Sequence, residues 1–223
     1  MKSISPDDLV YFSEVPESSG LVIDLAYARE DNFLFGERIY RQDAVLTLHR
    51  FMADIVIRAG RIARERHGLS LIIHDGLRTV DAQARMLETR AVKANPHWVE
   101  NEPRLLSPPG AGGHPRGMAV DVTLADLDGE VLDMGTVFDF LAEDPSPLTN
   151  PAHREYPQSV IAAINRGFLD SIMAEAAHQA GQPLFPLPQE WWDFRLPPEI
   201  YEGYAPLSDH DLPETLRLLA DTQ

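Results

Sequence analysis

Apolar residues recur at helical spacing in two long stretches of the chain. The first follows Asp43, a residue type favoured at helix N-caps, and ends at His67-Gly68, with apolar positions Leu48, Phe51, Met52, Ile55 and Ile62. The second follows Pro157, a residue type favoured at the first helical position, and ends at Gly181, with apolar positions Val160, Ile161, Ile164, Phe168, Ile172, Met173 and Ala176. We expect the first to be the main core helix and the second to pack across a sheet.

Shorter patterns predict strands between these helices. Leu71-Ile72-Ile73 suits a buried strand that delivers Asp75 and Arg78 to the loop at its end. In the strand predicted over 118–124, alternation places Met118, Val120 and Val122 opposite Ala119, Asp121 and Thr123. Thr79 is expected to cap a helix reaching about Lys93, and the tail from Asp211 to Gln223 is expected to form one short helix.

Proline and glycine concentrate between residues 95 and 113, which predicts an extended Pro/Gly-rich loop. Long loops are often functional, and this one leads directly into His114, so we expect it to form the rim or lid of a site. Few strands with helices outside them indicate an α+β fold. The length of 223 residues suits a single domain over 1–223.

Composition narrows the function classes. The net charge of −16 argues against a nucleic-acid partner, because nucleic-acid-binding proteins contact the phosphates through clustered Lys and Arg side chains. The absence of cysteine excludes disulfides and thiolate metal ligands. No apolar run approaches transmembrane length and the first residues lack the apolar core of a signal peptide, so we expect a cytoplasmic protein without membrane association. Whether it forms a homo-oligomer is left open.

Two short motifs carry metal-binding and acid-base chemistry. Gly112-Gly113-His114 runs through Gly117 to Asp121, and Glu190-Trp191-Trp192-Asp193 follows seventy residues later. An imidazole nitrogen and a carboxylate oxygen suit a divalent ion such as zinc, whose catalytic sites take three protein ligands and keep one position for water. A carboxylate that does not bind the metal can then accept the proton of the attacking water.

These motifs resemble those of the VanX-like D-alanyl-D-alanine dipeptidases of peptidase family M15, whose signature reads Ser-x-His-x-x-Gly-x-Ala-x-Asp and then Glu-x-x-His. Further blocks follow in the family's order across residues 20 to 195: Asp24-Leu25-Ala26-Tyr27-Ala28 with Asp31-Asn32-Phe33, then Asp75-Gly76-Leu77-Arg78, then Met134-Gly135-Thr136-Val137-Phe138-Asp139. Ordered blocks are more specific than any one motif. The resemblance implies a small, mainly antiparallel sheet packed by several helices.

The resemblance also implies roles for individual residues. His114, Asp121 and Asp193 would be the metal ligands, Glu190 the general base, and Arg78 the cation that stabilises the oxyanion. Substrate-binding positions of the family match Asp139, Asp75 and Tyr27, with Asp139 holding the substrate's amino end.

The chain departs from the signature at two positions of this site. Asp193 stands where the family has histidine, and Gly112 stands where it has serine. Aspartate can bind zinc, but a second carboxylate makes the site harder and shifts preference toward Mn²⁺ or Fe²⁺. It also makes the bound ion a weaker electrophile. The third outcome of the change to Asp193, besides an altered metal preference and a weaker electrophile, is a chain that keeps the fold but binds no catalytic metal.

The sequence therefore predicts a metal-dependent dipeptidase with zinc as the first candidate ion and D-Ala-D-Ala as the leading substrate. Two alternatives stay open. One is a diverged enzyme on the same scaffold that acts on another small amide or amino-acid-like compound. The other is an inactive homologue that binds a small peptide. The sequence does not separate peptidoglycan turnover, nutrient scavenging and glycopeptide resistance as physiological roles.

Overall fold

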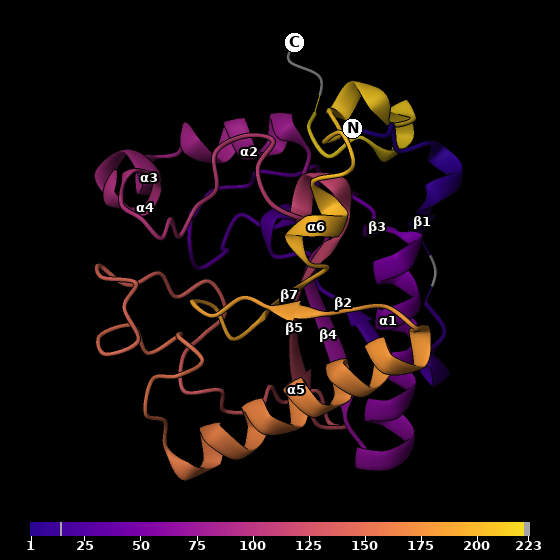
Figure 1. The fold of residues 1–223 in the computed structure, drawn as a ribbon, viewed down its shortest axis with the longest axis vertical. Helices are drawn as coiled ribbons and strands as arrows, with labels where there is room; N and C mark the ends of the chain where they lie inside the picture. Colours follow the sequence, from indigo (N-terminus) through magenta and orange to yellow (C-terminus); the bar gives the residue numbers. More distant parts are fainter. Residues whose placement is uncertain (14, 221–223) are drawn as a thin grey trace.

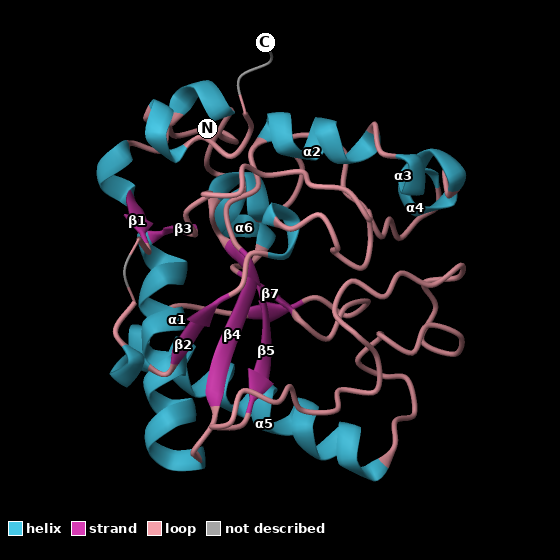
Figure 2. Cartoon of the chain, turned by 180° about the vertical axis from the view of Figure 1, so that it is seen from behind, coloured by secondary structure: helices cyan, strands magenta, loops and turns pink. Residues whose placement is uncertain are grey.

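A five-stranded sheet forms the centre of the computed structural model, which describes residues 1–13 and 15–220 (Figures 1 and 2). The strand order is β2-β4-β5-β7-β6, with β2 and β4 parallel and the other neighbours antiparallel. A separate antiparallel pair joins β1 to β3. The mainly antiparallel α+β fold is thus confirmed. The strands are β1 (Leu9–Tyr11), β2 (Leu21–Ile23), β3 (Thr47–His49), β4 (Ser70–Asp75), β5 (Ala119–Ala125), β6 (Phe185–Pro186) and β7 (Asp193–Arg195).

Two long helices, α1 (Arg50–Ile62) and α5 (Val160–Ala180), pack on each other and on the sheet. Their apolar faces share one core with β4 and β5, which contains Met52, Ile55, Ile73, Val120, Val122, Ile172 and Met173. The short helices α2 (Val80–Leu87), α3 (Arg90–Ala94) and α4 (His97–Glu100) lie at the opposite end of the molecule from α5 (Figure 1). They pack on a second apolar cluster that includes Tyr27 and Tyr40. The last helix, α6, spans Pro198–Tyr201.

Alternation along β5 separates the core from the polar face, as predicted. Val120 and Val122 enter the core beneath α1 and α5, whereas Asp121 and Thr123 belong to none of the apolar clusters and face the other way. This polar face carries the residues described in the next section.

A bulge in β4 brings Asp75 onto the same face as Asp121. Ile73 pairs with Val122, but the next pair is Asp75 with Asp121, so His74 is an extra residue on β4. Without it, Asp75 would point with Ile73 into the apolar core, because residues two apart on a strand share a face. The extra residue turns the carboxylate to the polar side.

Several predicted element boundaries were wrong. Asp43 does not cap the first helix but pairs with Arg41, and α1 begins only after His49, whose Nδ1 accepts the amide of Phe51. Leu46 lies just before β3 and Leu48 lies within it, and both are buried. Apolar residues at this spacing fit a strand as well as a helix.

The other corrections concern shorter segments. The helix predicted from Thr79 to Lys93 is broken at Thr89, which caps α3. Pro157 was predicted as the first helical residue, but α5 begins only at Val160, with Ser159 as its N-cap. The helix α4 interrupts the predicted 95–113 loop. The predicted tail helix is replaced by 3-10 turns at Asp209–Asp211 and Glu214–Leu216, and its last three residues lie outside the described ones.

No helix in the described ranges has both the length and the apolar character needed to cross a bilayer.

Candidate functional site

Three buried carboxylates stand in one row across neighbouring strands. Asp75 on β4 is the register partner of Asp121 on β5, and Asp121 is the partner of Asp193 on β7. Their exposed fractions are 0%, 2% and 1%. Adjacent strands lie about 4.8 Å apart, so the sheet itself holds three like charges close together. Such an arrangement requires cations among them.

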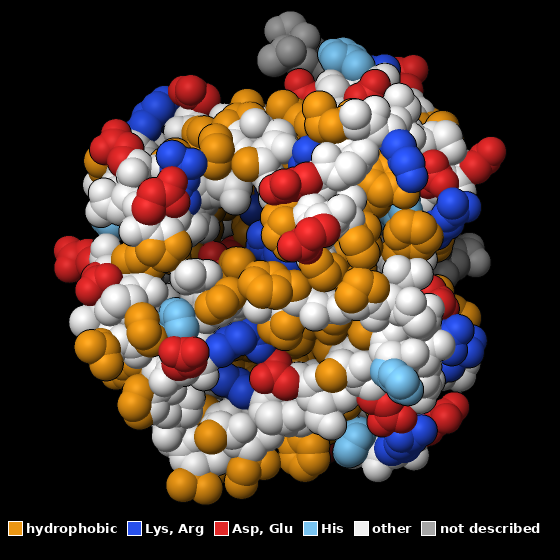
Figure 3. Space-filling model, viewed as in Figure 1, with side chains coloured by type: hydrophobic (Ala, Val, Ile, Leu, Met, Phe, Trp, Pro, Cys, Tyr) orange, Lys and Arg blue, Asp and Glu red, His pale blue; other side chains and the backbone are white. Residues whose placement is uncertain are grey.

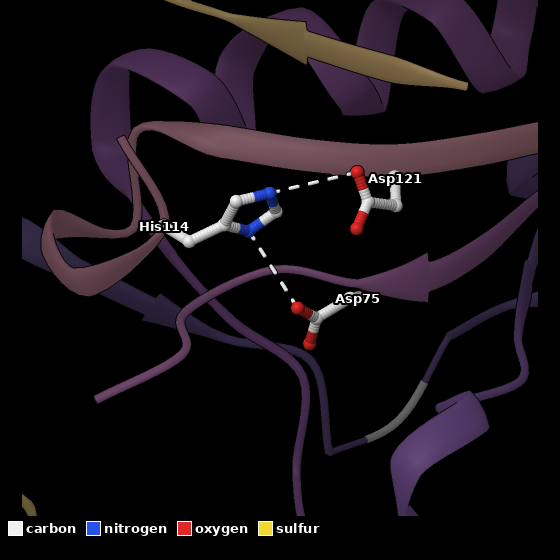
Figure 4. Close-up of side chains that lie close together, drawn as sticks. All are labelled: Asp75, His114 and Asp121. Carbon is white, nitrogen blue, oxygen red and sulfur yellow. Dashed lines mark ion pairs between the residues drawn. The ribbon is translucent and has the colours of Figure 1, made fainter. Parts of the chain in front are cut away.

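His114 provides one of these groups from a tight turn before β5. It begins the 3-10 turn His114–Arg116, which ends at Gly117 in the left-handed conformation, with φ of 63°. A side chain at position 117 would lie 2.7 Å from the backbone nitrogen of His49, so only glycine fits there. The turn points the imidazole back across the row of carboxylates, between Asp75 and Asp121 (Figure 4).

The two ring nitrogens of His114 have different surroundings. Nδ1 lies 2.8 Å from the carbonyl oxygen of Gly76 and donates to it, which leaves Nε2 to face the carboxylates. Nε2 lies 3.5 Å from Asp121 Oδ1 and 3.4 Å from Asp193 Oδ2. Burial opposes protonation of the ring, but Asp121 outweighs it and raises the pKa of His114 to about 10.

These residues fit a metal ion on the Nε2 side of His114. Asp121 Oδ1 is buried and accepts no hydrogen bond, an unusual state for a carboxylate oxygen. Two ligands of a tetrahedral zinc ion, each about 2.0–2.2 Å from it, lie about 3.4 Å apart, close to both Nε2–oxygen distances. The site therefore offers one imidazole nitrogen and one unpaired carboxylate oxygen to a cation.

Asp75 forms a second potential ligand set with His114 and Asp121, in which one donor atom from each lies within 4.8 Å of the others. Its own oxygens are already occupied, however. Oδ1 accepts from the Tyr40 hydroxyl at 2.9 Å and Oδ2 from Arg78 Nε at 2.9 Å. Because Asp75 faces the ring nitrogen that donates to Gly76, we assign it a structural role beside the site.

Asp193 reaches His114, as the predicted third ligand should, but it is also held by a cation. Arg195 Nε donates to Asp193 Oδ1 at 2.9 Å, and Arg195 Nη2 donates to Oδ2. Burial raises the pKa of Asp193, but Arg195 and His114 outweigh this effect and hold it below the ordinary value. The aspartate that replaces histidine thus has a partner that a histidine would not need.

Glu190 lines a cavity together with His114, Asp121 and Asp193. In the space-filling view the surface is hollowed between the α2–α4 segment and the loop after β5, with charged side chains of both signs inside (Figure 3). Burial raises the pKa of Glu190 well above its ordinary value, and Asp193 and Asp121 raise it further. A carboxyl group with a raised pKa holds a proton firmly, and a cation bound beside it would lower the pKa toward the range in which the group exchanges a proton with water.

Of the three predicted substrate residues, Tyr27 and Asp139 line the same cavity, whereas Asp75 is not among its lining residues. The Tyr27 hydroxyl donates to Asp139 Oδ1 at 3.0 Å, while Asp139 Oδ2 is buried without a partner. Burial, with a contribution from Asp121, raises the pKa of Asp139 to about 8. Asp139 also has a φ of 62°, a conformation that non-glycine residues rarely adopt. Arg78 donates from Nη2 to Asp121 Oδ2 at 3.2 Å and so joins β4 to the site.

Sequence reasoning missed two arginines that organise the site. Arg195 lies outside the recognised motifs, although its spacing of two from Asp193 puts both side chains on one face of β7. Arg154 donates to the carbonyl oxygens of Leu187, Trp191 and Asp193 and so holds the segment that carries Glu190. His153, a histidine in the loop after Asp139, does not line the cavity, and its Nδ1 accepts the amide of Glu155.

Comparisons with known proteins identify the family of this chain. The chain matches the peptidase M15 family model, described as D-Ala-D-Ala dipeptidase, over residues 8–210. It is 33% identical over 178 residues to the D-alanyl-D-alanine dipeptidase of Escherichia coli strain K12, covering 79% of each. A solved structure, the L-Ala D-Glu endopeptidase ChiX of Serratia marcescens, matches 69% of this chain and 84% of its own at 15% identity and a TM-score of 0.37, too low to carry an argument.

These matches place the chain in a family of peptidases, within the hydrolase class. It belongs to peptidase family M15, the D-Ala-D-Ala dipeptidase family, which confirms the resemblance seen in the sequence. The family is metal-dependent, and the row of carboxylates around His114 provides a candidate metal site.

Metal binding should release protons and weaken as the pH falls. With the pKa of His114 at about 10 in the absence of an ion, Nε2 is protonated at neutral pH, and a metal must displace that proton. We expect Zn²⁺ to release at least one proton near pH 7, and its affinity to fall about tenfold per pH unit below 10. Calorimetry in buffers of different ionisation enthalpy measures both.

Two variants check where the ion binds. Asp121→Asn is expected to lose the binding, whereas Asp128→Asn, which changes an exposed carboxylate beyond the end of β5, is expected to retain it. A pH-independent affinity, or equal affinity in both variants, would contradict the assignment.

Proposed function

We propose that this chain is a metal-dependent dipeptidase that hydrolyses a small dipeptide, D-Ala-D-Ala first among them. One observation carries the proposal: His114 Nε2 and the unpaired oxygen of Asp121 face each other on a cavity that Glu190 also lines. The D-alanyl-D-alanine dipeptidase of Escherichia coli, a relative that covers most of the chain, supports the choice of substrate.

Glu190 is the proposed general base. When bound, a divalent ion would polarise the scissile carbonyl and bring the pKa of a water molecule to about 7. Glu190 then accepts a proton from the attacking water and returns it to the leaving amine. Because the pKa of Glu190 is raised, it holds this proton readily between the two steps.

Arg78 and Asp139 are proposed to orient the substrate. The Arg78 guanidinium lies beside Asp121 and places positive charge where the carbonyl oxygen becomes negative. Asp139, fixed by the Tyr27 hydroxyl, has one buried oxygen without a partner and suits the ammonium group of a dipeptide, whose positive charge would lower the raised pKa of Asp139 and favour its carboxylate form. Asp75 supports Arg78 from behind rather than contacting the substrate.

The nature of the ligands bears on the metal. An imidazole with two carboxylates accepts Zn²⁺ but is harder than a site with two histidines, so Mn²⁺ and Fe²⁺ are the alternatives. The positive charge of Arg195 compensates part of the negative charge of Asp193. It thereby offsets part of the loss of electrophilicity that a second carboxylate would cause in a bound ion.

The Asp193–Arg195 ion pair also favours a second candidate function. Because both oxygens of Asp193 are bound by the guanidinium, the third ligand is engaged without a metal. A small-peptide-binding protein without turnover, or an enzyme diverged to another small amide, would suit such a site.

Glu190→Gln separates these functions. Removal of the base should reduce kcat for D-Ala-D-Ala by roughly a hundred- to ten-thousandfold while leaving bound metal unchanged. Glu143→Gln, at an exposed carboxylate in the loop after Asp139, is the matched control and should retain full turnover. Measurement of released D-alanine together with metal content decides the matter. Undiminished turnover in Glu190→Gln would remove Glu190 from its assigned role.

Asp139→Asn should act on substrate binding. Loss of the counter-charge to the ammonium group is expected to raise KM for the dipeptide roughly ten- to hundredfold, with a smaller change in kcat. Steady-state kinetics across dipeptide concentrations separate the two constants. An unchanged KM would show that the substrate's amino end binds elsewhere.

A further inference from the structure

Arg195 links the two departures of this chain from the family signature. Through Nε and Nη2 it holds Asp193, the residue in the position of the third histidine. Its remaining nitrogen, Nη1, lies 3.7 Å from where a Cβ would stand on Gly112, the residue in the position of the signature serine. Both changes therefore meet at one guanidinium.

The open edge of Arg195 belongs to the cavity. The side chain is 11% exposed and lines the cavity with His114 and Glu190. A guanidinium carries five N–H donors, and the Asp193 carboxylate engages only the edge formed by Nε and Nη2. Nη1 donates to no group among the described residues, and Gly112 adds no side chain that would cover it.

The position of Arg195 across the sheet complements that of Asp139. Asp139 is bound to Tyr27, which follows β2, whereas Arg195 lies on β7, with the β5 residue Asp121 between them in the strand order β2-β4-β5-β7. The Tyr27 hydroxyl that holds Asp139 lies 3.4 Å from Arg78 Nη2, which lies 3.2 Å from Asp121 Oδ2, so Asp139 approaches Asp121 from the side away from β7. A dipeptide of about 7 Å over Asp121 would therefore extend toward Asp139 at one end and toward Arg195 at the other. Its ammonium group would meet a carboxylate, and its carboxylate a guanidinium.

We propose that Arg195 is a specificity-determining residue that binds the free α-carboxylate at the C-terminal end of the substrate, in the space that Gly112 leaves open. This inference rests on the proposed dipeptidase function. The cavity is rich in carboxyl groups, so a substrate carboxylate needs a cation to receive it. Arg78 is bound by Asp75 and Asp121, and Arg104 pairs with Glu102 on the surface, whereas Arg195 presents an open edge to the cavity. A guanidinium binds carboxylates through two parallel hydrogen bonds, and its planar fork offers such an edge here.

The test compares D-Ala-D-Ala with its C-terminal amide. Binding is measured by calorimetry in the Zn²⁺-loaded Glu190→Gln chain, so that turnover does not interfere. We expect this chain to bind the acid roughly ten- to hundredfold more tightly than the amide. Adding Arg195→Gln should bring the two affinities to within about threefold, whereas Arg195→Lys, which keeps the charge, should retain part of the preference. The ratio of affinities within one variant is insensitive to a loss of folded or metal-loaded protein.

Arg104→Gln is the matched control, because Arg104 also lines the cavity but pairs with Glu102 on the surface. It should keep the preference for the acid. Equal binding of acid and amide before Arg195 is changed, or a preference that survives Arg195→Gln, would overturn the inference. So would loss of the preference in Arg104→Gln alone.

Turnover by the unmodified chain distinguishes the two proposals. If the unmodified chain cleaves D-Ala-D-Ala and its C-terminal amide equally well, the dipeptidase function stands and the proposed role of Arg195 fails. If it cleaves neither, but the Glu190→Gln chain shows an Arg195-dependent preference for the acid, the carboxylate site stands and the dipeptidase function fails.

Discussion

Burial of three adjacent carboxylates is the constraint on which the site depends. Asp75, Asp121 and Asp193 lie in one row across β4, β5 and β7, each almost fully buried. Removing an ion from water costs several kcal/mol unless charges and hydrogen bonds compensate for it. Arg78 lies between the first two carboxylates, Arg195 holds the third, and His114 approaches the second and the third.

This compensation is incomplete at two atoms. Asp121 Oδ1 and Asp139 Oδ2 are buried oxygens without hydrogen-bond partners, and Glu190 adds a further acidic group to the same cavity. In the proposed function each orphaned oxygen has its own cation, the metal at Asp121 and the substrate's ammonium group at Asp139. The pairing of β4, β5 and β7, the turn at His114 and the hydrogen bonds of Arg154 hold the acidic side chains of the site in place.

Much of this arrangement could be predicted from the sequence. Alternation along residues 118–124 correctly put Asp121 on the face away from the core, and the ordered blocks identified the family. The bulge at His74 could not be foreseen, because apolar Leu71-Ile72-Ile73 gives no sign of an extra residue in the pairing. The start of α1 was misplaced for a related reason: Leu46 and Leu48 fit either a strand or a helix. The spacing of two between Asp193 and Arg195 is consistent with a pair on one face of β7, but the burial of that pair is not visible in the sequence.

The most direct test of the central claim is a crystal structure of the Zn²⁺-loaded protein with anomalous scattering measured at the zinc edge. We expect one peak bonded to His114 Nε2 and to Asp121 Oδ1, with an oxygen of Asp193 as third ligand and Arg195 still bound to its other oxygen. A peak on the Asp75 side of the imidazole, or none within bonding distance of Asp121, would contradict the account.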